Sequence, residues 1–193
     1  MDSRKTILDK VRKNKPTLET KIDLLPFLVD NDEDLTFRFG VELVENGGQL
    51  LIPQKNENLR ELLLREINGN SYVDYSGLVD PNDGSILQDD QNSFSKINTA
   101  IFKVDLGVAE NGSIWLEDRN LNGFRILPFI VEHGIFILPK TKIVPTMHHA
   151  YAHLNEIKTG FGTFIAGPSK TGDIEQHLVV GAHGPLSHMV ILI

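Results

Sequence analysis

Residues that could carry out acid–base chemistry gather in the second half of the sequence. All seven histidines lie between positions 133 and 188. Asp173, Glu175 and His177 stand at alternate positions, so a strand would place them on one face, and a helix would still bring Asp173 beside His177. A carboxylate beside a histidine can fix its tautomer or tune it for proton transfer. A partly exposed ion pair is the alternative interpretation.

The segment GPSKTG, residues 167–172, has the composition of an anion-binding loop. Gly167 lets backbone N–H groups approach a ligand, while Ser169, Lys170 and Thr171 add donors and a positive charge. The segment lacks the residue order of a P-loop, and GFGTFIAG before it lacks the glycine spacing of a dinucleotide-binding fingerprint. A plain turn capped by Ser or Asp is the alternative.

Two further candidates, Glu110 and His183, each stand on a predicted connection. Glu110 precedes Asn111-Gly112, which is a strong signal for a β-hairpin. His183 lies beside Gly184 in GAHGP, directly before the apolar run HMVILI. Loops positioned by a rigid scaffold often bear binding and catalytic residues. A solvated side chain is the alternative at both positions.

A metal site is considered for His149 and His153, which are four residues apart on a predicted helix and share a face. Ala150 follows His149, so the sequence has no HExxH motif. Two surface histidines is the favoured interpretation, and we expect no metal site.

The elements that must position these residues alternate between helices and short apolar strands. Helices are predicted over 3–13, over 32–45 with Asn46-Gly47-Gly48 closing it, over 56–69 and over 144–158; strands are predicted at 49–53, 134–139, 162–167, 177–181 and 188–193, with a hairpin around Asn111-Gly112. The run HMVILI is expected to be a buried strand, with HLVV as its neighbour. We therefore predict an α/β protein with a mixed sheet flanked by helices. We expect one domain over 1–193, with a mainly helical part at 1–70 packed against the rest.

The composition of the chain excludes some classes of partner and location. The 193 residues carry a net charge of −7 and include no cysteine. An acidic chain is a poor match for nucleic acid, because phosphate binding requires Lys and Arg. No apolar run approaches the ~20 residues that span a bilayer, and the N-terminus has no signal-peptide pattern. We expect no nucleic-acid partner, no membrane insertion and a cytoplasmic location.

Three segments resemble the signature segments of the lactate-utilisation protein C family, whose domain is called LUD. These segments are GVAENGSIWL at 107–116, GPSKTGDIE at 167–175 and GAHGPLSHMVILI at 181–193, and the resemblance extends over 98–193. Ser113, Gly172 and Ala182 replace the family's usual Thr, Ala and Val, whereas Glu110, Asp173, Glu175 and His183 are kept.

The resemblance implies a fold related to the ribose-phosphate isomerase, glucosamine-phosphate deaminase and CoA-transferase group, with ligands at loops beyond strand ends. It also implies a role in oxidising L-lactate to pyruvate together with iron–sulfur partner proteins. Local chemistry and the related fold together nominate Glu110, Asp173, Glu175 and His183 as catalytic groups. They nominate Gly167, Ser169, Lys170, Thr171 and Gly184 as binding residues for a small anionic ligand.

The sequence itself constrains this role. Without cysteine the chain has no ligands for a standard iron–sulfur cluster, and it lacks a nicotinamide or flavin fingerprint. We expect no cofactor and infer that the chain does not carry the electrons itself. It would act as an assembly partner, a substrate-handling subunit or a regulator. A stand-alone small-molecule enzyme or binder and a purely structural interaction module are the alternatives.

Overall fold

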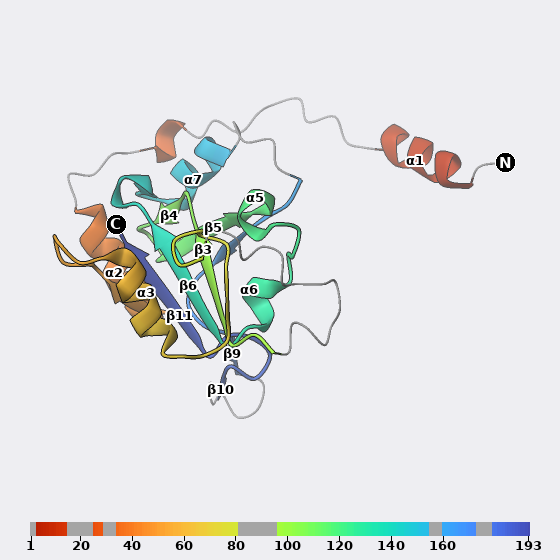
Figure 1. Cartoon of the computed structure of the whole chain (residues 1–193). Coiled ribbons are helices and arrows are strands. Elements are labelled where there is room, and N and C mark those ends of the chain that lie inside the picture. The colour runs from red at the N-terminus through yellow and green to blue at the C-terminus, as the bar shows by residue number, and fades with distance from the viewer. Residues whose placement is uncertain (1–2, 15–24, 29–33, 81–95, 155–159, 173–178) are drawn as a thin grey trace.

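The protein is described here from a computed structural model, which describes residues 3–14, 25–28, 34–80, 96–154, 160–172 and 179–193 (Figure 1). The helices are α1 (Ser3–Lys13), η1 (Leu25–Phe27), α2 (Leu35–Glu45), α3 (Leu59–Ile67), α5 (Asp118–Leu121), α6 (Leu127–Ile130), η3 (Lys140–Lys142) and α7 (Met147–Leu154). The strands are β1 (Gln49–Leu51), β2 (Tyr72–Asp74), β3 (Thr99–Lys103), β4 (Gly107–Val108), β5 (Ser113–Glu117), β6 (His133–Leu138), β7 (Ile143–Val144), β8 (Gly162–Ile165), β9 (Lys170–Thr171), β10 (Val179–Val180) and β11 (Ser187–Leu192).

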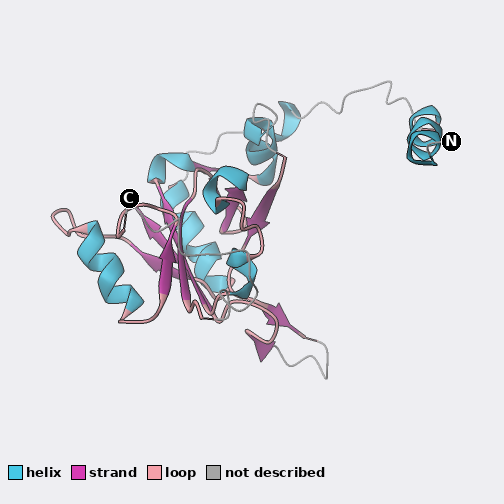
Figure 2. Ribbon diagram, turned by 45° about the vertical axis from the view of Figure 1, so that its right-hand side comes forward, coloured by secondary structure: helices cyan, strands magenta, loops and turns pink. Residues whose placement is uncertain are grey.

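A parallel five-stranded sheet in the order β1-β11-β6-β3-β2 forms the centre of the molecule (Figure 2). β11 pairs with β6 from Ser187↔His133 to Leu192↔Leu138 and with β1 on its other side. Strands of parallel sheets are buried on both faces and read as continuous apolar runs. Val190, Ile191 and Leu192 are accordingly fully buried, which confirms the prediction of a buried strand in HMVILI.

The two faces of this sheet support two different apolar cores, because successive side chains point to opposite faces. Phe102, Phe136 and Val190 face a core that also includes Phe39 and Leu43 of α2. The odd-numbered residues of the same strands, Ile101, Ile135, Ile137 and Ile191, face a second core. This core also includes Leu62, Leu63 and Ile67 of α3. The sheet is thus covered by α3 on one face and by α2 on the other.

A second, mixed sheet in the order β7-β4-β5-β8 packs on the α2 side. β4 and β5 form an antiparallel hairpin with Val108 opposite Ser113, so the hairpin predicted at Asn111-Gly112 is confirmed. On its other side β5 pairs with β8 in the antiparallel direction, with Trp115 opposite Phe164. Ile114 and Leu116 of β5 join the core that contains Phe39.

One sequence-based expectation about the strands is confirmed only in part, and another is wrong. The α/β class and the presence of a mixed sheet are confirmed, but the central sheet is entirely parallel and the mixed pairings form a second sheet. The two described residues of HLVV are not neighbours of β11, because Val179 and Val180 pair with Thr171 and Lys170 of β9 in a separate two-stranded ribbon. Both valines are about half exposed, so their apolar character does not mark a core strand.

Polar side chains cap the starts of α2 and α3. The Asp34 carboxylate accepts hydrogen bonds from the N–H groups of Thr36 and Phe37, which satisfies two of the free donors at the start of α2. Asn58 caps α3 in the same way, by accepting from Arg60 N. α3 ends at Asn68 in the left-handed conformation, with φ 51°. The helices predicted over 32–45 and 56–69 are confirmed, and the structure starts them later, at Leu35 and Leu59.

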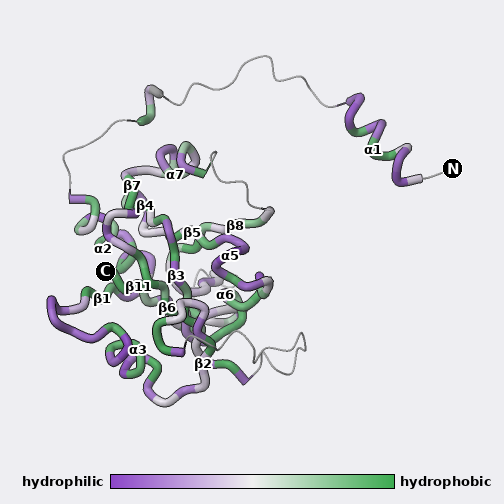
Figure 3. The backbone as a smooth tube through the Cα atoms, turned by 45° about the horizontal axis from the view of Figure 1, so that its top comes forward, coloured by the Kyte–Doolittle hydropathy of each residue, from purple (hydrophilic) through white to green (hydrophobic). Residues whose placement is uncertain are grey.

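α1 stands apart from the rest of the described structure. Its residues are all exposed and none is buried, so the expected packing of this N-terminal helix against the domain is not observed. Figures 1 and 3 place it on the far side of the molecule from α2. Over the residues that the structure describes, every helix is too short or too polar to traverse a bilayer.

Candidate functional site

The loops of the second and third motif segments meet at a cavity of about 280 Å³. One wall comes from the chain between β8 and β9, a second from the loop before β11, and a third from α6. The structure brings four of the predicted site residues to this cavity, namely Gly167, Ser169, His183 and Gly184. We refer to it below as the motif cavity.

Backbone hydrogen bonds join the two motif loops. Ser169 N donates to Pro185 O at 3.0 Å, and Gly181 N donates to Ser169 O at 2.9 Å. Gly184 allows this approach, because a Cβ at its position would lie 2.9 Å from the Ser169 Cβ and 3.2 Å from Phe129 O. The glycine therefore serves close packing of the loop against β9 and α6.

The motif cavity combines an apolar lining with two polar side chains. Pro128, Phe129 and Phe164 supply apolar surface, while the Ser169 hydroxyl and the His183 imidazole supply hydrogen-bonding groups. Small-molecule sites are typically concave and apolar, with a few polar groups that fix orientation. Ser169 is half-buried and His183 is exposed, so the cavity can exchange molecules with solvent.

The first motif segment meets the second at the C-terminal end of α2. Asn46 donates through Nδ2 to Glu42 O at 3.0 Å and to Asn111 O at 2.9 Å, which ties the hairpin loop to the helix. Gly167 lies against the same residue, with φ +76° and no space for a Cβ beside Asn46 O. Asn46 is therefore the residue where both segments converge.

The next two predicted binding residues do not line the motif cavity. Lys170 is exposed, and its side chain passes over Gly47, where a built Cβ would lie 3.5 Å from the ammonium nitrogen. Thr171 donates through Oγ1 to Val179 O at 3.4 Å and so stays within the β9–β10 ribbon. Their proposed contact with a ligand remains a prediction.

Glu110 occupies a different place again. Its exposed carboxylate accepts a hydrogen bond at 2.8 Å from Met147 N, at the first residue of α7, and its own N–H donates to Pro145 O. Negative charge at a helix N-terminus satisfies free donors and the helix dipole. The contact observed for Glu110 is therefore with α7, away from the motif cavity. Asp173, Glu175 and His177 lie outside the described residues, and their roles stay predictions.

The motif cavity lies beside the amino ends of the central strands. The loop with His183 and Gly184 leads into β11, and α6 leads into β6, so both walls precede parallel strands. The β9–β10 ribbon lies at the same end of the molecule (Figure 2). In open parallel sheets ligands usually bind beyond the carboxyl ends. The motif cavity lies instead at the amino ends of the central strands, and the end of β8 forms part of its wall.

Sequence reasoning did not single out two residues at this site. Asn46 was interpreted only as a helix stop, although an Asn before two glycines also offers a side chain able to tie loops together. Phe129 belongs to an apolar stretch of the sequence, and nothing in its local pattern distinguishes it from a core residue. Its exposed fraction of 38% marks it instead as a wall of the cavity.

His188, in contrast, is a core residue. It is 2% exposed, and its ring packs on Phe136 with centroids 4.5 Å apart. Its Nε2 has no hydrogen-bond partner among the described residues. Burial lowers the pKa of His188 to about 4, because the charged ring would lose its hydration. The residue is therefore neutral at pH 7.

Metal binding finds no support in the part of the chain that the structure describes, where no three His, Asp or Glu side chains gather as metal ligands would. His149 shares a hydrogen bond of 2.8 Å between its Nδ1 and Thr146 Oγ1.

The fold and the motif loops define an α/β protein with a parallel central sheet and a second, mixed sheet. A similar arrangement occurs in the crystal structure of a DUF162 family protein from Deinococcus radiodurans, with a TM-score of 0.61 and 18% identity, covering 82% of this chain and 95% of that one. The family model described as LUD domain matches residues 85–193, which is more than half of the chain. The chain belongs to the LUD domain family.

Two curated relatives with similar sequences are both named Lactate utilization protein C. Lactate utilization protein C of Geobacillus thermodenitrificans (strain NG80-2) is 38% identical over 102 residues, which is 50% of this chain and 42% of that protein. Lactate utilization protein C of Oceanobacillus iheyensis is 34% identical over 117 residues, which is 58% of this chain and 50% of that protein. The chain spans about half the length of the curated relatives it matches.

Proposed function

We propose that this protein is a non-redox component of an L-lactate utilisation system and that it works with iron–sulfur partner proteins. The observation that carries this proposal is the 38% identity to Lactate utilization protein C over 102 residues, in a chain that brings two of the three motif loops together at one cavity. The absence of cysteine from the sequence supports a role in which partner proteins carry the electrons.

Within that role, the motif cavity is proposed to bind a small carboxylate such as L-lactate or pyruvate. A volume of about 280 Å³ accommodates such a molecule. Ser169 would donate a hydrogen bond to the carboxylate, and His183 would donate one or exchange a proton at the hydroxyl or keto oxygen. Glu110, Asp173 and Glu175 are proposed to assist as acid–base groups, and Lys170 to attract the anion.

Growth on L-lactate tests the biological role. A deletion of the gene is expected to slow growth on L-lactate as sole carbon source and to leave growth on glucose normal. The wild-type gene should restore growth, whereas a Ser169→Ala/His183→Ala double variant of equal abundance should not. His153→Ala, which changes an exposed histidine on α7, is the matched control and should restore growth fully. Normal growth of the deletion strain on L-lactate would refute the proposal.

A second candidate function is a stand-alone enzyme or binder of the isomerase and transferase-like fold group that the family resembles. The apolar cavity with one hydroxyl and one imidazole favours it, since this arrangement requires no partner protein.

Ligand-dependent thermal stability separates the two functions. A ligand that binds the native state raises the melting temperature. L-Lactate or pyruvate is expected to do so in the wild type and not in the Ser169→Ala/His183→Ala variant. A shift with sugar phosphates or CoA esters alone would favour the second candidate. If no compound changed the melting temperature, the proposed ligand site would be wrong.

A further inference from the structure

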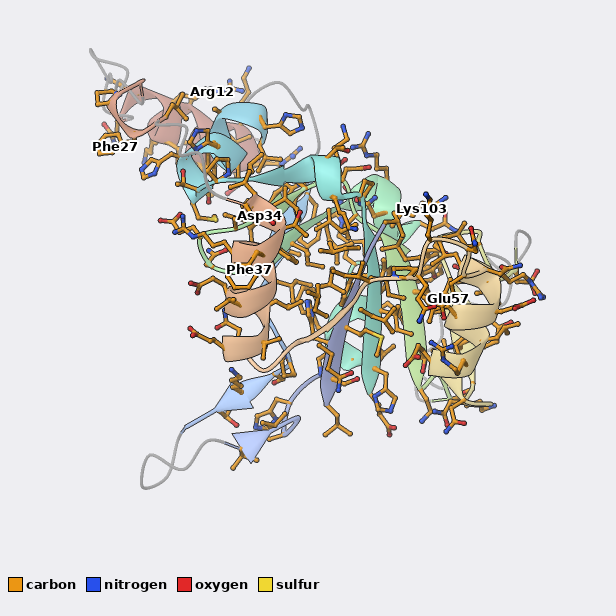
Figure 4. All side chains as sticks on the ribbon, turned by 90° about the vertical axis from the view of Figure 1, so that its left-hand side faces the viewer. Arg12, Phe27, Asp34, Phe37, Glu57 and Lys103 are labelled. Carbon is orange, nitrogen blue, oxygen red and sulfur yellow. The ribbon has the colours of Figure 1, made fainter. Side chains whose placement is uncertain are left out.

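An apolar groove of about 570 Å³ lies between α2 and β1. Phe37, Val41 and Val44 of the helix and Leu50 and Ile52 at the strand line it. Phe37 is 71% exposed and Val44 is 57% exposed, although both are large apolar side chains. Figure 4 shows Phe37 one turn after Asp34 on this helix. We call this feature the α2–β1 groove.

The groove also borders an open edge of the central sheet. β1 is the last strand of the five-stranded sheet, paired with β11 on one side. Parallel sheets are normally covered, and proteins protect exposed edges with a helix or a loop. A helix lying in the α2–β1 groove would cover the exposed apolar side chains and shield this edge.

α1 has the properties of a helix that would fit. Ile7, Leu8 and Val11 fall on one face of the helix and are 58%, 43% and 56% exposed. Amphipathic helices with apolar residues at such spacing dock into hydrophobic grooves. α1 and α2 each have 11 residues, so both are about 16 Å long at 1.5 Å per residue. Figure 3 shows hydrophilic residues interrupted by hydrophobic ones along α1.

Charge complements this fit in shape. α1 carries five basic residues and one acidic residue, namely Arg4, Lys5, Lys10, Arg12, Lys13 and Asp9. The α2–β1 groove has Asp34 at one end and Glu45 at the other. Acidic residues at both ends of an apolar groove favour a basic amphipathic helix over an acidic one.

The helix that occupies the groove is expected to come from another molecule. Phe27 of η1 stacks on His148 of α7 with ring centroids 4.8 Å apart, which places η1 beside α7. The chain's own α1 lies on the far side of the molecule from α2 (Figures 1 and 3). If two copies exchanged their α1 helices, each helix would fill the groove of the other molecule. The two contacts would then be related by a twofold axis, as in a closed homodimer.

We propose that α1 of a second copy of this chain binds in the α2–β1 groove and that the protein thereby forms a homodimer by reciprocal exchange of α1. Ile7, Leu8 and Val11 contact Phe37, Val41 and Val44 of the partner molecule. The basic side chains of α1 lie near Asp34 and Glu45.

Disulfide cross-linking tests the proposal directly, because the sequence contains no cysteine. A Leu8→Cys variant and a Val44→Cys variant are mixed in equal amounts and oxidised. A mixed covalent dimer is expected. The matched control pairs Leu8→Cys with Ile126→Cys, since Ile126 is 55% exposed, like Val44, but lies before α6. An equal yield with Ile126→Cys would indicate random collision and overturn the proposal.

The double variant Leu8→Cys/Val44→Cys distinguishes exchange from self-docking. Covalent dimers are the expected product, whereas a cross-linked monomer would show that each chain covers its own groove and would overturn the proposal.

Sedimentation of the unmodified protein provides a second readout. A dimer is expected at micromolar concentration, and Leu8→Asp should convert it to a monomer. Because α1 contains no buried residue, this variant should fold normally. A monomeric wild type, or a dimer that persists in both Leu8→Asp and Val44→Asp, would contradict the exchange.

Discussion

Gly112 and Gly167 show at the residue scale why two motif positions carry glycine. Both have positive φ, of +62° and +76°, and both press against the backbone at the end of α2. A Cβ on Gly112 would lie 2.7 Å from the Glu42 carbonyl carbon, and one on Gly167 would overlap Asn46 O. Only glycine meets both demands without strain. These residues therefore determine how closely the first two motif segments approach each other.

The substitution Gly167→Ala is expected to destabilise the protein by more than its backbone conformation alone explains. Gly69→Ala is the matched control, because Gly69 also has φ +76° but has no atom within 4 Å of a built Cβ. Left-handed conformation costs an Ala roughly 1–2 kcal/mol, and the contact with Asn46 should add about 1–3 kcal/mol, as overpacking does. Urea unfolding measures both variants, and equal losses would contradict a close packing of Gly167 on α2.

His188 should make stability depend on pH. Its pKa is about 4 when folded, compared with 6.5 for the free side chain, so between these values the unfolded chain binds a proton that the folded chain does not. Its contribution is complete above pH 6.5, falls as the pH drops to 4 and is constant below that. The total loss is about 3 kcal/mol.

The measurement for His188 compares urea unfolding between pH 4 and 7.5 in the wild type and in His188→Leu. The stability of the variant relative to the wild type should rise as the pH falls through this range. A flat difference for His188→Leu would mean that the buried ring does not titrate as described.

At the scale of elements, Glu110 links the β4–β5 hairpin to α7. Glu110→Ala removes the acceptor for Met147 N and should cost about 0.5–1 kcal/mol, as the loss of a helix cap does. Glu110→Gln keeps an acceptor oxygen and should lose only the interaction of the charge with the helix dipole, about 0.3–1 kcal/mol. Urea unfolding gives both values. An unchanged stability in Glu110→Ala would contradict the capping role, and loss of lactate growth in a stable Glu110→Gln would support acid–base chemistry.

Local signals explain which elements could be predicted from the sequence. The caps at Asp34 and Asn58 and the Asn-Gly turn at 111–112 depend on neighbouring residues, and the structure contains the predicted helices and hairpin. Strand partners depend on residues far apart in the sequence. β11 lies between β1 and β6 because their apolar faces complete two cores, and no pattern within HMVILI or HLVV contains that information.

The sequence likewise predicted only part of the candidate site. Gly167, Ser169, His183 and Gly184 were nominated from small and polar residues beside apolar runs together with the family resemblance, and they line one cavity, which Lys170 and Thr171 do not. Asn46 and Phe129 belong to parts of the chain where local pattern indicates only a helix end and an apolar stretch. Their role arises from the approach of α2 and α6 to the motif loops, which is set by tertiary packing.

At the scale of the whole molecule, the motif cavity lies at the margin of the packed core. β6 and β11 lie at the centre of the parallel sheet between two cores, with Val190, Ile191 and Leu192 fully buried. The motif cavity instead adjoins the two-residue strands β9 and β10, whose valines are about half exposed. Segments with few buried contacts open at low free-energy cost, and ligand-binding loops are often drawn from them.

Hydrogen exchange should reveal this division across the whole chain. Amides of β6 and β11 are expected to exchange only by global unfolding, while those of β9 and β10 exchange at least a hundredfold faster, which corresponds to about 2.7 kcal/mol less protection. L-Lactate or pyruvate should slow exchange at 167–171 and 181–186, because a molecule in the motif cavity holds both loops together. The Ser169→Ala/His183→Ala variant should lose this ligand effect and retain the protection of β6 and β11. If β9 and β10 exchanged as slowly as β11, with or without ligand, the motif loops would belong to the rigid core. This result would contradict a site at the margin of that core.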